Sequence, residues 1–190
     1  MQKNGFSLLE TLIALVILCL SLVMLFSIFV LAQKFYQRGE VEAELLQNGR
    51  IIIERISREA RQAAEMVSAL PLSEIEFQDG HNPSPYDYLN SDYYYVRYYL
   101  DAVSHEFHRQ YRVYCFDDCS LCSSFYRWND KTMQDGQEVF THACDLEDYV
   151  VGEYVSSVQF SGAGVINFSL TLSHNNQTVY LKSAVFGRDL

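Results

Sequence analysis

The sequence predicts an α+β fold in which one long N-terminal helix packs against an antiparallel β-sheet domain. Three observations support this prediction. An uninterrupted apolar segment opens the chain, a charged segment with helical periodicity follows, and the remainder is rich in aromatic and β-branched runs separated by turn residues. A chain of 190 residues can hold one globular domain of ordinary size beside such a helix.

The apolar segment has the length of a membrane span. From Thr11 to Ala32 it contains no charged residue, no glycine and no proline. At about 1.5 Å per residue a helix of this length reaches roughly 33 Å, enough to cross a hydrocarbon core. No small-residue cleavage site follows it, and the bulky residues before Cys19 do not fit a lipoprotein signal. We therefore expect the segment to remain on the mature protein as a transmembrane helix.

One acidic residue, Glu10, stands within the apolar surroundings. An unpaired carboxylate inside a bilayer or a helical bundle costs a few kcal/mol, so Glu10 needs a cation. The alternative is a neutral Glu10 at the interface of a plain membrane anchor.

The octet Lys3-Asn4-Gly5-Phe6-Ser7-Leu8-Leu9-Glu10 resembles the class III signal of type IV pilins and type II secretion pseudopilins. The resemblance implies that a membrane-embedded prepilin peptidase cuts between Gly5 and Phe6 and methylates the new terminal amine of Phe6. It also implies that Glu10 pairs with the amine of a neighbouring subunit during filament assembly. The expected organisation is a leader peptide over 1–5, a transmembrane and assembly half of the helix over 6–32, an amphipathic half over 33–67 and an exported β-rich domain over 68–190.

The segment after Ala32 is charged but keeps helical periodicity. Six apolar residues recur at spacings of three, four or seven positions, namely Leu45, Ile52, Ile56, Ala60, Ala63 and Val67. Such a stripe is typical of an amphipathic helix with one buried face, so we predict one helix from Phe6 to about Val67. Gly39 and Gly49 are candidate bends within it. Pro71 closes the region because the residue before a proline avoids the α conformation.

Turn signals lie between Pro71 and Asp92, and aromatic or β-branched runs follow them. We predict one short strand at 74–78. Further antiparallel strands are predicted at 93–100, 109–116, 125–128, 137–141, 155–160, 165–172 and 178–186. Apolar and polar residues alternate over 168–173, and residues 174–177 can form a turn, so the C-terminus is predicted to be a meander.

The charge is unevenly distributed. The chain has a formal net charge of −10, and from Met66 onward 17 acidic residues face seven basic ones, so the expected exported domain carries the whole imbalance. Such a domain should be soluble, and its average field disfavours nucleic acid as a partner.

Four cysteines, Cys115, Cys119, Cys122 and Cys144, lie in the part expected to reach an oxidising compartment. Two disulfides are the default expectation, with three possible pairings. A zinc site with His142 is an alternative, although the second cysteine pair of a zinc ribbon is missing. Free thiols are the third alternative. A redox role for Cys119 and Cys122 is disfavoured because two neighbouring aspartates oppose a reactive thiolate.

Other clusters are weaker candidates for chemistry. His105 and His108 would face opposite sides of a strand, so we expect surface or loop histidines. The acidic groups at 117–118 and 145–148 lack the spacing of a calcium loop, and a solvated acidic face is expected instead. Among the tyrosines of 93–99, alternate members should be core and the others form a candidate contact surface. We find no Ser-His-acid grouping, phosphate loop or spaced carboxylate pair, so we expect neither an enzyme nor a cofactor.

Residues 50–63 are similar to the helix of J-type minor pseudopilins and of the larger minor pilins. Together with the octet, this similarity implies a minor pilin or pseudopilin that helps initiate or cap a type IV pilus or a type II secretion pseudopilus. The implied partners are the prepilin peptidase, other minor and major pilins or pseudopilins, and an inner-membrane assembly platform. The implied location is the inner membrane, by a single span, and then the filament. A tip adhesin or DNA-uptake minor pilin, and an anchored domain that never polymerises, are the alternatives.

Overall fold

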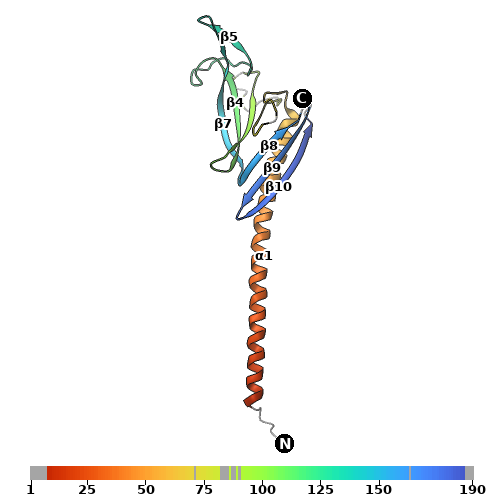
Figure 1. Cartoon of the computed structure of the whole chain (residues 1–190). Helices are drawn as coiled ribbons and strands as arrows, with labels where there is room; N and C mark the ends of the chain where they lie inside the picture. The colour runs from red at the N-terminus through yellow and green to blue at the C-terminus, as the bar shows by residue number, and fades with distance from the viewer. Residues whose placement is uncertain are drawn as a thin grey trace. The chain divides into compact units, whose positions relative to one another are not determined.

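The computed structural model describes residues 8–70, 72–81, 86, 89, 91–162 and 164–186. Within these residues one helix is followed by ten strands, which confirms the predicted α+β class (Figure 1). The chain divides into two compact units, residues 1–43 and residues 44–190, and the helix contributes to both.

Helix α1 spans Leu8–Gln62, so it ends five residues before the predicted limit at Val67. The backbone after Gln62 pairs with strand β2 (Ile75–Gln78) instead of continuing the helix. The N–H of Ala64 donates to the carbonyl of Gln78 at 3.0 Å, and the N–H of Val67 donates to the carbonyl of Glu76 at 2.9 Å. The strand β1 (Glu65–Met66) lies between these two bonds. The prediction for 63–67 was wrong because the backbone groups of these residues form hydrogen bonds within a sheet. The spacing of apolar residues cannot reveal such bonds.

The strands form three antiparallel sheets. Five strands are ordered β1-β2-β3-β4-β7, three are ordered β10-β9-β8, and β5 pairs with β6. The remaining bounds are β3 Tyr95–Asp101, β4 Glu106–Cys115, β5 Lys131–Gln134, β6 Gln137–Phe140, β7 His142–Gly152, β8 Val155–Ser161, β9 Val165–His174 and β10 Gln177–Phe186.

The C-terminal meander is confirmed, with β8, β9 and β10 pairing in sequence. In the middle of the chain the prediction was wrong at three places, the first being strand β5, which was not predicted. Strand β7, with eleven residues, was missed because its acidic side chains lower its apparent strand propensity. Residues 125–128 form no strand and contribute only one bridge, between Tyr126 and Tyr114.

The second unit has its core between the α1 segment from Glu44 onward and the sheets (Figure 1). The predicted stripe is confirmed as far as Ala63, because Leu45, Ile52, Ile56, Ala60 and Ala63 are all at most 2% exposed, whereas Val67 lies beyond the helix and is only half-buried. Helix α1 continues through Gly49, which lets strand β10 approach, since a Cβ there would lie 2.2 Å from the Cδ1 of Leu181. Gly152 allows a similar approach of strand β7 to Ile52.

A buried carboxylate also joins the helix to the sheet. Glu59 is 8% exposed and accepts hydrogen bonds from the Nε of Arg109 at 2.9 and 3.1 Å and from the hydroxyl of Tyr98 at 2.7 Å. Burial, and then the Glu59 carboxylate, raises the pKa of Tyr98 far above its ordinary value, so its hydroxyl stays a donor. Burial alone would lower the pKa of Arg109, but the Glu59 carboxylate outweighs burial and raises it, which keeps the guanidinium charged.

The replacement Arg109→Met should lower the free energy of unfolding by about 3 to 5 kcal/mol, because it leaves Glu59 buried without its main cation. Chemical denaturation of the full chain in detergent, followed by circular dichroism, measures the change. The matched control is Lys131→Met, which breaks the half-exposed pair of Lys131 with Glu138 and should cost at most about 1 kcal/mol. Equal losses for the two variants would contradict a structural role for the buried pair.

Candidate assembly and processing site

The first half of helix α1 presents apolar side chains outward. From Leu8 to Leu31 its large hydrophobic residues are about half or more exposed, apart from the intermediate Val30. The hydroxyls of Thr11, Ser21 and Ser27 donate to backbone carbonyls three or four positions earlier, at 2.8 to 2.9 Å. The polar side chains are thus satisfied inside the helix, and its length and composition suit a membrane crossing.

Glu10 lies exposed in the first turn of this helix. A carboxylate there interacts favourably with the unpaired N–H groups of the helix N-terminus. The expected processing residues Gly5 and Phe6 lie outside the described residues, so the structure places the acid of the expected ion pair and not the amine.

Residues 1–26 match the family model described as the prokaryotic N-terminal methylation motif. This motif supports a type IV pilin or pseudopilin-like protein. No curated protein and no solved structure matches the chain.

For a pilin-like protein the motif implies processing by the prepilin peptidase and assembly with other pilins. Together with the apolar helix it is consistent with a single membrane span, and it points to a structural subunit rather than an enzyme. The matched residues include Gly5, Phe6, Glu10 and most of the apolar segment. The role of the globular domain therefore has to be argued from its own structure.

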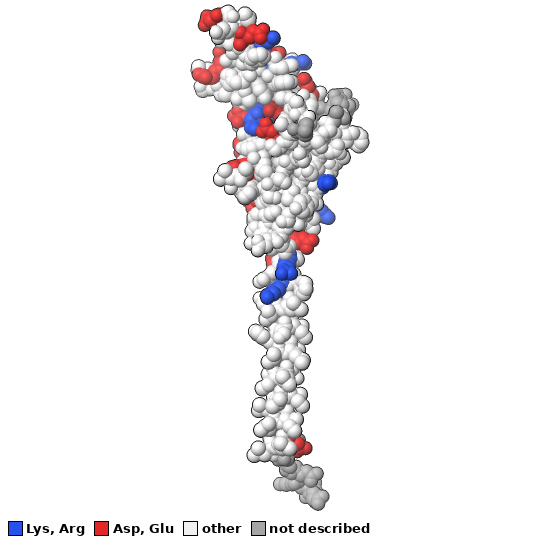
Figure 2. Space-filling view, in the orientation of Figure 1, with Lys and Arg blue, Asp and Glu red and all other residues white. Residues whose placement is uncertain are grey.

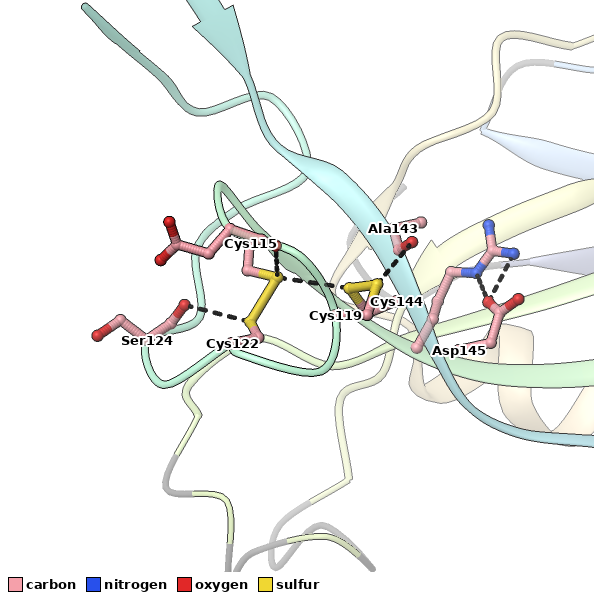
Figure 3. The surroundings of a disulfide bond; sticks show 9 residues. Cys115, Cys119, Cys122, Ser124, Ala143, Cys144 and Asp145 are labelled. Atoms are coloured by element: carbon pink, nitrogen blue, oxygen red, sulfur yellow. Dashed lines mark hydrogen bonds and ion pairs between the residues drawn. A yellow bond between two sulfur atoms is a disulfide. The ribbon is translucent and has the colours of Figure 1, made fainter. Parts of the chain in front are cut away.

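The four cysteines of that domain meet at the end of the β4–β7 pair (Figure 3). Cys115 ends strand β4, Cys144 lies in strand β7, and Cys119 and Cys122 come from the loop after strand β4. The structure joins Cys115 to Cys122 and Cys119 to Cys144, with Cα atoms 6.2 and 5.4 Å apart. The Sγ atoms of Cys115 and Cys144 lie 3.4 Å apart, so the two bridges are in contact.

The alternative prediction, a zinc site, agrees with the positions of three side chains. Ligand atoms of Cys115, His142 and Cys144 lie within 4.8 Å of one another. However, in this structure both cysteines belong to disulfides, which leave no thiolate to bind a metal. We therefore still predict that the four cysteines form two disulfides, now in the pairing given above out of the three that are possible.

The acidic residues of strand β7 do more than form the solvated face that we expected. Asp145 accepts from the Nε of Arg112 at 2.9 Å, and Glu147 accepts from the hydroxyl of Tyr86. Asp148 is bound at 2.9 Å by three side chains of the neighbouring strands, Tyr99, His108 and Gln110. Burial would raise the pKa of Asp148, but these hydrogen bonds hold it below its ordinary value. The carboxylates thus stabilise strand β7 against its neighbours.

The histidines lie largely as expected, but the tyrosines do not alternate between core and surface, because the consecutive Tyr94 and Tyr95 are both buried. His105 is in a turn, with a φ of 59°, whereas His108 is on strand β4 and contacts Asp148. Tyr95 and Tyr98 are fully buried, while Tyr99 remains partly exposed. Burial, and then the hydrogen bond to Asp148, raises the pKa of Tyr99 to about 12. Sequence reasoning missed the partners of these groups because they come from strands distant along the chain.

We predict that the protein extracted from membranes without reductant has one reactive thiol, Cys19. Peptide mapping after digestion beside aspartate, aromatic and leucine residues, which also cuts after Leu121 between Cys119 and Cys122, should recover the links Cys115 to Cys122 and Cys119 to Cys144. Loss of the longer loop, through Cys119→Ser with Cys144→Ser, should cost a few kcal/mol, about 2 to 4, whereas the control Cys19→Ser should leave domain stability unchanged. Five reactive thiols, or one zinc ion per chain, would overturn the pairing.

Proposed function

We propose that this pilin-like protein is a minor pilin or pseudopilin that helps initiate or cap a type IV pilus or a type II secretion pseudopilus. The observation that carries the proposal is the methylation motif over residues 1–26, continuous with an apolar helix that leads into a β-rich domain. Proteins of this design insert in a membrane first and pack their helices into a filament later.

Glu10 supports the assembly step. Its carboxylate is exposed in an otherwise apolar part of the helix, and cleavage at Gly5 would create a protonatable amine on Phe6. A charge-assisted hydrogen bond between that amine and the Glu10 of a neighbouring subunit would neutralise both groups inside an apolar bundle. A monomer in the membrane lacks this neighbour, so the pair favours the assembled state.

The minor role is supported by the charge and by the helix sequence. A net charge of −10 in every subunit would place many like charges side by side along a filament, which opposes a role as the repeating subunit. A subunit used once or a few times at the end avoids this repulsion. The segment Arg50 to Ala63, similar to the helix of J-type minor pseudopilins, packs on the domain through Ile52, Ile56 and Glu59.

The replacement Glu10→Val should leave processing and membrane insertion intact and reduce incorporation into filaments severalfold, since the amine of a neighbour then meets no carboxylate. The measurement is the ratio of filament-bound to membrane-bound protein. Intact mass should show that wild type and variant alike lack residues 1–5 and carry an N-methylated Phe6. The control Glu40→Val changes an exposed acid beyond the apolar segment and should keep the wild-type ratio. Equal ratios for both variants would mean that Glu10 has no assembly role.

The minor role also predicts abundance. Quantitative mass spectrometry of sheared filaments should find this chain at roughly a hundredth of the main subunit or less, because an initiating or capping subunit occupies one end of the helical array. Deleting the chain should reduce the number of filaments much more than their length. Amounts comparable to the main subunit would contradict the proposal, and complete absence from filaments would favour an anchored domain that never polymerises.

A further inference from the structure

Strand β10 forms an open edge of the three-stranded sheet. Among the strands that the structure describes, it pairs only with β9, in ten consecutive registers from Gln177 to Phe186 without a bulge. The loop before it is the two-residue turn Asn175-Asn176, with φ values of 48° and 62°. In such a hairpin His174 and Gln177 form a hydrogen-bonded pair, and successive residues then alternate. The backbone groups that face the open edge therefore belong to the even positions 178, 180, 182, 184 and 186.

The other edges of the two large sheets are protected. Leu72 covers the edge of β8 through two backbone hydrogen bonds with Phe160, at 2.8 and 3.2 Å. Strand β1 has two residues, too few to template another strand. Strand β7 shows two register shifts against β4 and carries the three acids described above, and bulges and charges both oppose edge pairing. Strand β10 has no proline, no bulge and one charged residue, Lys182.

The side chains of β10 are also incompletely covered. Leu170 and Leu172 of β9 are at most 1% exposed, but their cross-strand partners Leu181 and Val179 are only half-buried. On the outward face, Tyr180 and Phe186 are 74% and 72% exposed. Another strand beside β10 would bury part of both sets. A ten-residue apolar edge of this kind is the feature that soluble monomers avoid, so its retention indicates a partner.

The charged residues on and around β10 indicate which charge the partner strand carries. Figure 2 shows that the surface over β8, β9 and β10 is mostly free of charge, with both basic and acidic residues at its margin. Lys182 is exposed, and strand β10 contains no acid. A second copy of β10 could therefore not offer Lys182 a counter-charge, whereas a strand with an aspartate or glutamate opposite Lys182 would form a favourable cross-strand pair.

We propose that strand β10 accepts an additional antiparallel or parallel strand from a different pilin-type subunit, an extended apolar segment with an acid facing Lys182. The proposal rests on the proposed function, since the filament supplies the neighbour. Backbone hydrogen bonds along the edge provide the affinity, and Lys182, Tyr180 and Phe186 select the partner strand. The contact joins unlike surfaces, which is the kind of contact that builds open helical arrays.

Amide hydrogen exchange of the full chain tests this. In detergent, without other subunits, the amides at the even positions of β10 should exchange quickly, and those at the odd positions should be protected by β9. In filaments the even positions should exchange at least roughly tenfold more slowly. Filaments that contain the chain but leave these amides unprotected would overturn the inference and spare the proposed function. Absence of the chain from filaments would overturn both. If the amides at the even positions are already protected in detergent, the strand beside β10 comes from a second copy of this chain. The proposal of a different subunit would then be wrong.

Two pairs of variants sharpen the test. Ala184→Pro removes an edge N–H without touching the bonds to β9 and should lower incorporation into filaments severalfold, while Ala184→Val keeps the N–H and should not. Lys182→Glu should lower incorporation, and Lys182→Arg should preserve it. Protected odd-numbered amides in detergent show that each variant is folded. If Ala184→Val is as defective as Ala184→Pro, the outward face rather than the edge is the contact, and the inference fails.

Discussion

The buried carboxylate of Glu59 is the constraint on which the second unit depends. An acidic side chain at 8% exposure needs charged or hydrogen-bonding partners, and Arg109 and Tyr98 provide both from adjacent strands. These hydrogen bonds fix the position of the helix against strands β3 and β4, because a shift would leave the carboxylate buried without its partners. Close approach at Gly49 and Gly152 then brings strands β10 and β7 against the same helix.

A carboxylate removed from water needs a cation or hydrogen-bond donors, and this rule applies to two acids of helix α1 with different results. Glu59 finds its cation within the chain, so it stabilises the folded domain. Glu10 lies exposed in the apolar half of the same helix, and the cation that we propose for it is the amine of a neighbouring subunit. Glu59 thus favours folding, and on the proposed function Glu10 favours assembly.

The edge strands of the two larger sheets also differ in whether they can pair with a further strand. Strand β7 is closed to further pairing by acids that bind Arg112, Tyr99 and Gln110 across the sheet, and β8 is covered by Leu72. These features direct any further strand to β10. Among the described strands of the two larger sheets, protected edges therefore stand beside the long, regular edge of β10.

Local patterns determined much of this protein. The apolar segment, the octet around Gly5, the helical stripe and the C-terminal hairpin are readable because each depends on neighbours a few positions away. Tertiary structure decided the rest. Helix α1 stops at Gln62 because strand β2 binds the next backbone groups, and strand β7 forms from an acidic sequence because its partners lie on β3 and β4. Glu59 and Arg109 are 50 positions apart, and the pairing of four cysteines depends on how strands β4 and β7 align. Periodicity and propensity carry no information about contacts at such separations, so only the folded chain could reveal them.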